Sequence, residues 1–198
     1  MSKTVAKKIR PAKIYTGKDS DAFEDEFHRL LGRLIRHSAR FDFNVGLQLN
    51  WMSAYYGFKL GDLLNPKKTP MQKRVAKLKS VCKKVFQPAG AEAMAEFAEW
   101  FAKVDKARAL RNDYVHGRWS VPGGHCGGPD TPFQDCELVL AFVPLHWNLS
   151  PETMPDEIKM TLGEFEQQVE DAISLFGQYF KLEKKYMRDM RLGTDGLG

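Results

Sequence analysis

Hydrophobic residues recur every three or four positions in four long stretches of the chain, which is the spacing of one face of an α-helix. The first stretch begins at Asp19 or Ser20 and runs to about Tyr56. Its apolar positions are Phe23, Phe27, Leu30, Leu34, Phe41, Val45, Leu49, Met52 and Tyr56. A polar gap around Ser38 leaves open whether this is one long helix or two abutting helices.

Three further stretches predict helices of different character. A stripe formed by Met71, Val75, Leu78, Cys82 and Val85 predicts an amphipathic helix with lysines on its other faces, ending before Pro88. The third helix spans about Glu92 to His116 and is terminated by Gly117. The last covers about Leu162 to Met187, with Phe165, Val169, Ile173, Phe176 and Phe180 on one stripe.

Between the third and last helices the pattern changes to that of strands and turns. Residues 118–135 are rich in glycine and proline, and Cys136–Pro144 reads as a buried strand. Arg118–Pro122 is the candidate antiparallel partner. The sequence therefore predicts an all-α fold, an antiparallel bundle of four or more helices with a small inserted β-hairpin at about 118–144.

Charge is distributed unevenly along the 198 residues. Residues 1–18 contain six of the 30 basic residues and no acid, and predict a disordered basic arm before a folded domain at 19–187. Residues 188–198 are expected to be a flexible tail. Eight basic residues and no acid lie between Leu63 and Ala91, whereas ten acids and one base lie between Trp119 and Asp171. This polarity would either steer a polyanion to one side or reflect two solvated faces.

Composition excludes several classes of protein. No run approaches the ~18 apolar residues of a membrane span, and the N-terminus lacks the apolar stretch of a signal peptide. Three cysteines are too few, and odd in number, for a disulfide framework. We therefore expect a cytoplasmic protein in a reducing setting, with no membrane partner.

The candidate chemistry lies at the end of the third helix. Continuing the apolar stripe from Val104 leads to Arg111, so an arginine occupies a position where a core residue is expected. Asn112 and His116 are four residues apart and share a helix face, so the amide is placed to orient the imidazole. His116 lies in the last turn, where the helix dipole favours its protonated form.

An arginine and a histidine at this spacing suit phosphodiester chemistry, because one supplies a fixed cation and the other titrates near neutral pH. When a ribose 2′-OH attacks the adjacent phosphate, general acid–base catalysis needs no metal. The alternative is structural: Arg111 pairs with an acid on a neighbouring helix, and His116 caps carbonyls at the helix end.

The string from Arg111 through Val115-His116-Gly117 to Trp119 resembles the R-x4-H motif of the HEPN superfamily (higher eukaryote and prokaryote nucleotide-binding), in which a polar residue follows the arginine. The resemblance covers about residues 20–187. It implies a HEPN-like bundle and a homodimer in which two motifs converge on one cleft. The chain departs from the pattern in its first helix, where such families often have a glutamate and this sequence has Asp42.

The resemblance further implies a metal-independent endoribonuclease, a toxin or phage-defence component without cofactor. Arg111 would bind the phosphate, His116 would act as acid and base, and Asn112 would orient them. RNA would be held by Lys73, Lys77, Lys84, Arg108 and Arg118 together with the N-terminal arm, and an antitoxin-like protein partner is left open. The alternative function is a non-catalytic binding or assembly module, in which Arg111 and His116 stabilise the helix end.

Two other clusters are weighed. His125, Cys126, Cys136 and His146 have a spacing that matches no common zinc pattern, so no metal site is expected. Trp51, Tyr55 and Tyr56 resemble a platform for stacking bases. Aromatic residues at helical spacing more often belong to the core, and a core position is predicted for these three.

Overall fold

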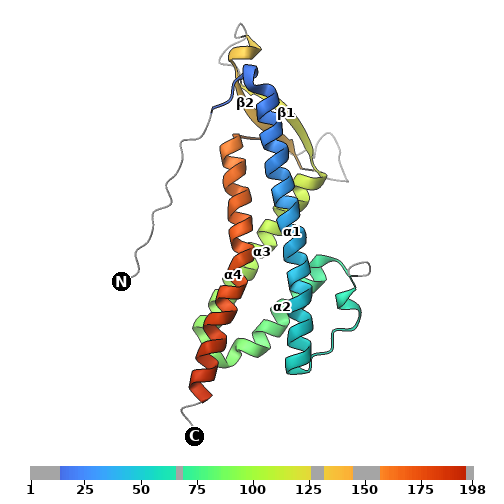
Figure 1. The fold of residues 1–198 in the computed structure, drawn as a ribbon, viewed down its shortest axis with the longest axis vertical. Helices are drawn as coiled ribbons and strands as arrows, with labels where there is room; N and C mark the ends of the chain where they lie inside the picture. The colour runs from blue at the N-terminus through green and yellow to red at the C-terminus, as the bar shows by residue number, and fades with distance from the viewer. Residues whose placement is uncertain (1–13, 66–68, 126–131, 145–156, 195–198) are drawn as a thin grey trace, which may run out of the picture. The chain divides into compact units, whose positions relative to one another are not determined.

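The computed structural model describes residues 14–65, 69–125, 132–144 and 157–194, with backbone only for 121–125 and 188–194. Within these residues the chain is mostly helical, with four α-helices and a three-stranded antiparallel sheet (Figure 1). It divides into two compact units. Residues 1–30 and 117–168 form the sheet unit, and residues 31–116 and 169–198 form the helical unit.

The helices begin and end close to the predicted positions. They are α1 (Ser20–Tyr56), α2 (Met71–Phe86), α3 (Ala91–His116) and α4 (Leu162–Thr194). The open question about the first stretch is answered: α1 is one continuous helix, and Ser38 in its polar gap is buried. The tail predicted from residue 188 is wrong as far as Thr194, because α4 continues through it.

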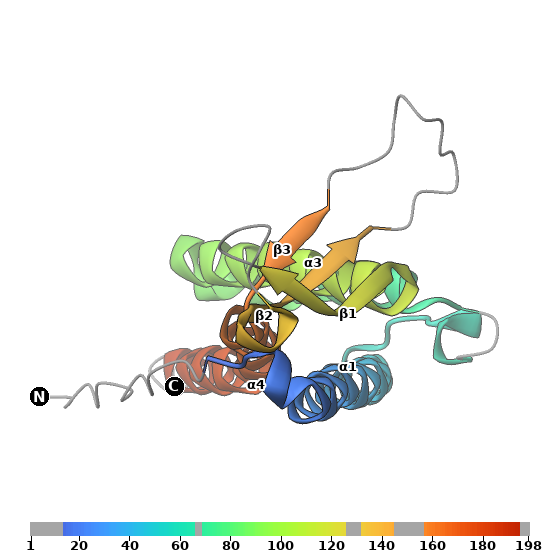
Figure 2. The same ribbon diagram turned by 90° about the horizontal axis from the view of Figure 1, so that it is seen from above.

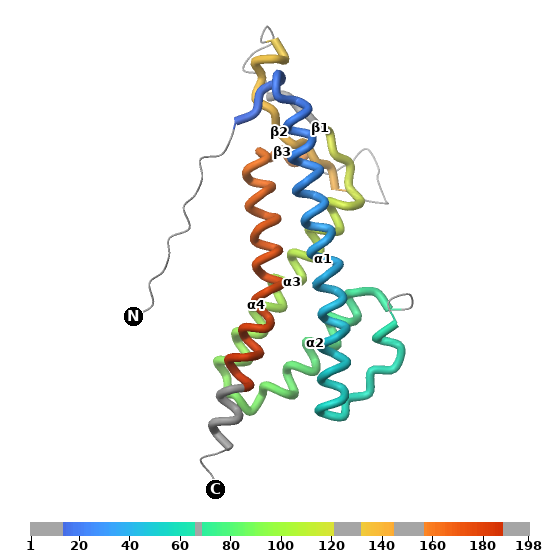
Figure 3. Tube along the Cα trace, viewed as in Figure 1, coloured from blue at the N-terminus to red at the C-terminus, as the bar shows by residue number. Residues whose placement is uncertain are grey.

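In the helical unit, α3 runs opposite to α1 and α4, which run in the same direction (Figures 1 and 3). The simple antiparallel bundle expected from short connections therefore needs correction. The connector between Gly57 and Pro70 is long enough to return the chain before α2, so α1 and α2 are not joined as a tight hairpin.

The core of the helical unit is contributed by all four helices. Phe41, Val45, Leu49 and Met52 come from α1 and meet a row on α2 that includes Val75, Leu78 and Cys82. Phe97, Trp100, Phe101 and Val104 of α3 and Leu175, Phe176 and Tyr179 of α4 complete the cluster. Each belongs to the apolar face of its helix, so burial of these faces is the main source of stability in this unit.

The sheet unit contains β1 (Arg118–His125), β2 (Glu137–Val143) and β3 (Ile158–Met160), with β2 in the centre (Figure 2). The predicted hairpin is confirmed: Trp119 pairs with Phe142 and Ser120 with Ala141 in an antiparallel register. The register shifts between Ser120 and Gly123, where Pro122 lacks the N–H that a regular ladder needs. The edge strand β3 was not predicted.

Trp119 lies at the centre of an aromatic cluster in the sheet unit. Its ring centroid is 4.8 Å from that of Phe27, 4.7 Å from that of Phe142 and 5.5 Å from that of Phe165. These residues come from α1, β2 and α4. The tryptophan that ends the Arg–His motif is therefore a packing residue that joins a strand to two helices.

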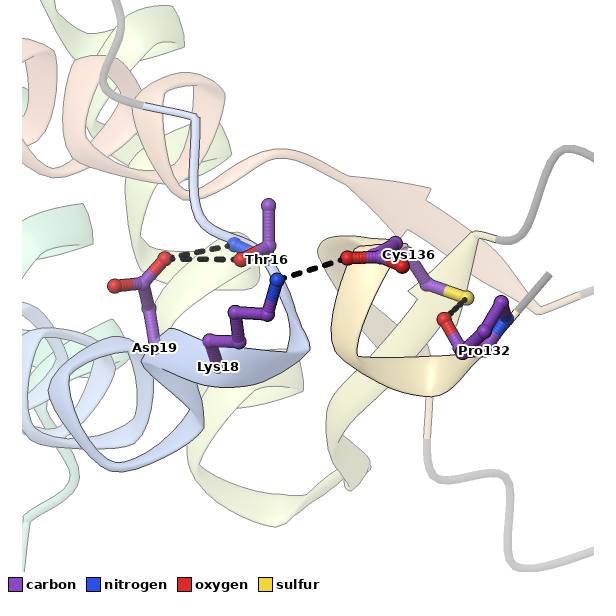
Figure 4. A network of polar contacts seen from close by, with 6 residues as sticks. Thr16, Lys18, Asp19, Pro132 and Cys136 are labelled. Carbon is purple, nitrogen blue, oxygen red and sulfur yellow. Dashed lines mark hydrogen bonds and ion pairs between the residues drawn. The ribbon is translucent and has the colours of Figure 1, made fainter.

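The prediction of a disordered arm up to residue 18 is wrong for its last five residues, which pair with the sheet unit. The N–H of Leu138 donates to the carbonyl of Tyr15 at 2.9 Å, and the N–H of Gly17 donates to the carbonyl of Cys136 at 3.1 Å. Thr16 caps a short 3-10 helix, Gly17–Asp19, through its hydrogen bonds with Asp19 (Figure 4). The segment thus extends the sheet beside β2.

Gly17 is required at this position because the chains approach very closely. A Cβ atom added there would lie 2.1 Å from the carbonyl oxygen of Phe133. The contact is with backbone and cannot be relieved by rotating a side chain, so glycine is the residue that fits.

One of the three cysteines does not agree with the expectation of a reducing setting. Cys136 is disulfide-bonded, whereas Cys82 is a buried free thiol in the helical unit. The Sγ of Cys136 also lies 3.4 Å from the carbonyl oxygen of Pro132 (Figure 4). A disulfide sulfur has no hydrogen to donate, so this is a packing contact. Because Cys136 forms a disulfide, the number of cysteines by itself does not indicate a reducing setting.

Candidate functional site

Arg111 lies in the penultimate turn of α3, where it is partly buried and not fully enclosed as its place on the apolar stripe predicts. Its guanidinium Nη1 donates to the side-chain oxygen of the next residue, Asn112, at 3.0 Å. Within the described part of the chain no carboxylate pairs with Arg111. The ion pair with a neighbouring helix, which was the structural alternative, is therefore not found there, and the positive charge of Arg111 is not neutralised by any described acid.

Asn112 has a different partner from the one predicted. Its amide oxygen accepts the hydrogen bond from Arg111, and no bond joins it to His116 among the described residues. Because the contact is between sequence neighbours on one helix, it restricts the arginine side chain without tying α3 to another element. The side chain of Asn112 therefore orients Arg111 and does not orient His116.

His116 is the last residue of α3 and its side chain is exposed. Where the structure describes side chains, His116 takes part in no hydrogen bond or ion pair. Tyr114 between these two residues is buried, and Asp113 is exposed and contacts neither of them. The end of α3 thus presents an exposed imidazole and a partly buried guanidinium, neither of which is paired with a described acid.

Asp42, at the position where HEPN-like families often have a glutamate, forms its ion pair elsewhere. It forms an ion pair with Arg74 of α2, whose side chain is only 7% exposed while that of Asp42 is 28% exposed. One carboxylate oxygen of Asp42 and the Nε of Arg74 have no hydrogen-bond partner among the described residues. This carboxylate fastens α1 to α2 and is not free to serve the Arg111–His116 pair.

The predicted RNA contacts fall in different environments. Lys73 and Lys84 are exposed on α2 and Lys77 is partly exposed, and none makes an ion pair with a described residue. Arg108 is largely buried, and its Nη2 lies 3.7 Å from Asp105 Oδ1, so its charge is partly offset. Arg118 is exposed at the start of β1, in the sheet unit. The lysines of α2 therefore remain the better candidates.

A second basic cluster on α1 was not singled out from the sequence. Arg36 and Arg40 are exposed and unpaired among the described residues, while Arg33 pairs with Glu170 at 2.6 Å. His37 lies among them, and its pKa is lowered, first by burial and then by these three arginines. The sequence signal was three arginines and a histidine within eight residues, inside a helix that was predicted from its apolar pattern.

The aromatic residues at the end of α1 are a correction. Trp51 and Tyr55 are exposed and their rings stack, with centroids 5.5 Å apart and an angle of 12° between the planes. Tyr56 is partly buried and packs against the core of the helical unit. The prediction of core positions is therefore wrong for the first two. Trp51 lines an open groove with Phe180 of α4 and stays 41% exposed, and Tyr55 is 64% exposed.

A polar cluster lies where α1, α2 and α4 meet, with Cys82 and Tyr179 buried and Gln48 and Glu183 partly buried. The Sγ of Cys82 and the hydroxyl of Tyr179 are 3.6 Å apart, and Gln48 donates to the carboxylate of Glu183. Burial raises the pKa of Cys82 to about 12 and raises the pKa of Glu183. A thiol with so high a pKa is a poor nucleophile, so this cluster does not form a reactive-cysteine site.

No metal centre or membrane span is found in the part of the chain that the structure describes. No three histidine, cysteine or acidic side chains gather there as ligands. Of the four residues considered for zinc, Cys126 and His146 lie outside the described residues, and Cys136 is disulfide-bonded. None of the described helices combines the length and apolarity that crossing a bilayer requires.

The end of α3 offers a cation for an anionic group at Arg111 and, five residues later, an exposed imidazole at His116. No family model, curated protein or solved structure matches this chain. A proposal about its function therefore depends on the residues themselves.

Proposed function

We propose that this protein is a metal-independent endoribonuclease of HEPN type, a toxin or defence component that acts as a homodimer. The observation that carries the proposal is the state of Arg111. Its guanidinium is partly buried, positioned by Asn112 and unpaired with any described carboxylate, five residues before an exposed histidine. A cation left without a protein counter-ion is suited to bind a phosphate.

In the proposed reaction Arg111 binds the phosphate and stabilises the charge that develops on its oxygens. His116 removes the proton of the ribose 2′-OH, which attacks the adjacent phosphorus. The bond to the 5′-oxygen then breaks, and this oxygen takes a proton from a protonated imidazole, which a second copy of the motif would supply. The products are a 2′,3′-cyclic phosphate and a 5′-hydroxyl, so no metal-bound water is needed.

The exposed lysines of α2 support binding of the RNA backbone. Lys73 and Lys84 make no ion pair with described residues, so contact with phosphates would not require breaking an existing salt bridge. Such contacts release counter-ions from the nucleic acid, and binding should weaken steeply as salt rises. Little sequence preference is expected, since phosphate contacts carry no base information.

The test is cleavage of a mixed-sequence RNA in the presence of EDTA, with a histidine variant and its matched control. His116→Ala should lose about 100-fold or more of the rate, the usual contribution of a general acid or base. His28→Ala should retain it, because His28 is likewise exposed but lies on α1 in the sheet unit. Equal cleavage by His116→Ala and wild type would overturn the mechanism.

The second candidate is a non-catalytic HEPN-like binding or assembly module. The observation that favours it is the ion pair between Asp42 and Arg74. Asp42 is at the position of the glutamate that HEPN-like families often have, and in this ion pair its carboxylate is not available for catalysis. Under this function Arg111 and His116 stabilise the end of α3, and Arg111→Ala should lower the melting temperature markedly. Under the enzyme function the same variant should lose activity and keep its stability to within about 1 kcal/mol, because its hydrogen bond to Asn112 is a single partly exposed contact.

A further inference from the structure

A row of large apolar side chains lies exposed along one side of α1. Phe43, Leu47, Trp51 and Tyr55 are spaced four residues apart and are 66%, 53%, 41% and 64% exposed. We call this row the α1 ridge. The core residues Phe41, Val45, Leu49 and Met52 belong to another face of the same helix. In its second half, α1 therefore has two apolar faces, of which the helical unit covers one.

The α1 residues of the ridge carry no charge, and the groove beside them is lined by one acid and one base of α4, Glu183 and Lys184. From Phe43 to Phe58 the sequence has no Asp, Glu, Lys, Arg or His, although 28% of the chain is charged. Solvated helix faces in soluble proteins are normally charged, and a large exposed apolar patch marks a site of interaction. A face without charge can meet a copy of itself without bringing like charges together.

Small residues lie beside the ridge. Gly46, Asn50 and Ala54 are also spaced four residues apart and form a row next to the bulky one. Between rows of larger side chains, such a row acts as a groove on the helix surface. A Cβ added at Gly46 would meet nothing within 4 Å, so the space above this glycine is open. When the i±4 ridge of one helix fits the i±4 groove of another, the helices cross at about −50°, the commonest packing of two helices.

We propose that the α1 ridge and its groove form the interface with a second copy of this chain. In a two-fold pair the same patch faces itself, so the ridge of each copy would fill the groove of the other. The α1 face contains both halves of this fit: a bulky row and a row of small residues, at the same spacing and without charge.

The available area is in the range that an interface needs. Phe180 of α4 is 45% exposed and lines, with Trp51, an open groove of about 380 Å³ beside the ridge. With ~150–250 Å² for a whole aromatic side chain, the exposed parts of Phe43, Trp51, Tyr55 and Phe180 present roughly 400 Å² per copy. Leu47, Gly46, Asn50 and Ala54 add further area. The total then approaches the ~600 Å² that each partner buries in the smaller specific interfaces.

A second copy fits this face better than RNA does. Sites that stack single-stranded bases combine aromatic rings with a positively charged groove. Here no basic residue lies between Asp42 and Lys59, and Lys184 in the groove beside Trp51 is accompanied by Glu183, so the groove has no net positive charge. The inference supplies a surface for the proposed homodimer but does not depend on cleavage. Its readout is molecular mass, so loss of ribonuclease activity in an intact dimer would refute only the function. A dimer that is unaffected by changes at the ridge would refute only the surface, and a monomer would refute both.

The first experiment measures the mass of the full chain by sedimentation equilibrium from 1 to 100 µM. Twice the 22.6 kDa chain mass is expected in the upper part of this range. Leu47→Glu should raise the dissociation constant at least 100-fold, because it places two carboxylates in an apolar interface. Leu64→Glu is the matched control, an exposed leucine outside α1, and should behave as wild type.

A second pair of variants tests the groove without adding charge. Gly46→Gln should raise the dissociation constant at least tenfold by filling the groove, whereas Gly32→Gln on the same helix should not. Neither glycine has an atom within 4 Å of an added Cβ, so both variants should fold and gain helix propensity alike. Circular dichroism and the thermal midpoint check that both variants fold. If the two variants are equally helical and equally stable, a difference between their dissociation constants reports on association alone.

Three results would overturn the proposal. One is a wild-type monomer at 100 µM. Another is a dimer whose dissociation constant is unchanged by both Leu47→Glu and Gly46→Gln, which would place the interface elsewhere. The third is a monomer whose Trp51 becomes protected when single-stranded poly(U) or phosphatidylcholine vesicles are added, which would make nucleic acid or lipid the occupant of this face.

Discussion

Removing the carboxylate of Asp42 should destabilise the helical unit through Arg74. The two side chains form an ion pair between α1 and α2, and Arg74 is almost completely buried. In Asp42→Leu the guanidinium keeps its charge but loses the acid that compensates it. This variant isolates the cost of leaving a buried charge unpaired.

The size of the effect follows from the burial of the two groups. Breaking a fully buried ion pair costs about 3–5 kcal/mol. Here the carboxylate is 28% exposed, so water reaches the pair and reduces the penalty. We expect Asp42→Leu to lower the free energy of unfolding by about 2–3 kcal/mol. Arg74→Met should cost less, about 1–2 kcal/mol, because the remaining carboxylate can turn toward solvent.

The double variant separates two effects: the penalty of leaving one buried charge unpaired, and the net attraction between the two charges. Asp42 Oδ1 and Arg74 Nε have no described partner, so the pair is incompletely hydrogen-bonded. Replacing both residues by apolar ones of similar volume is then expected to stay within about 1 kcal/mol of wild type. The double-mutant cycle should therefore show a coupling of about 2 kcal/mol or more between positions 42 and 74.

Urea unfolding at pH 7, followed by circular dichroism at 222 nm, measures these differences. If Asp42→Leu costs less than about 0.5 kcal/mol, or if the single costs simply add in the double variant, the pair does not have the role described here. The double variant also tests whether Asp42 takes the role of the glutamate that HEPN-like families often have. A folded double variant that cleaves RNA at the wild-type rate would show that Asp42 is structural.

Three further outcomes are expected. Gly17→Ala should lower the free energy of unfolding by about 1–3 kcal/mol, because its Cβ would lie 2.1 Å from the backbone oxygen of Phe133; an unchanged urea midpoint would contradict this close approach. Burial raises the pKa of Glu183, so its charged form opposes folding and stability falls as pH rises through that pKa. Glu183→Gln should therefore raise the thermal midpoint at pH 8 and leave it unchanged at pH 4, where the wild-type carboxyl is protonated. Cys82, with a pKa of about 12, should resist iodoacetamide at pH 8 in the native protein and react after unfolding, as mass spectrometry of the labelled chain would show.

Much of the secondary structure was predictable from the spacing of apolar residues. The bounds of α1, α2 and α3 agree with the predicted ones to within a residue or two, since a repeat of 3.6 residues over several turns is a strong local signal. The strand β3, only three residues long at Ile158–Met160, was missed because so short an edge strand has no periodicity to read.

The candidate site was predictable as a list of residues but not as an arrangement. Arg111 and His116 were found from their types and spacing, yet the sequence placed Arg111 in the core and joined Asn112 to His116. In the structure the guanidinium is partly exposed and is itself the partner of Asn112. Both differences arise because a hydrogen-bond partner depends on side-chain direction and on what covers the helix, which residue spacing does not specify.

The course of the chain into helices and a hairpin was determined by the sequence itself, because helix and strand periods are local properties. Which of two apolar faces on α1 would be buried was not. Phe43, Leu47, Trp51 and Tyr55 repeat every four residues, a spacing as suitable for a core stripe as that of the buried residues of α1. Only the packing of α2, α3 and α4 against one face decided the matter, because burial is the sum of contacts from distant segments, and it left the other row exposed.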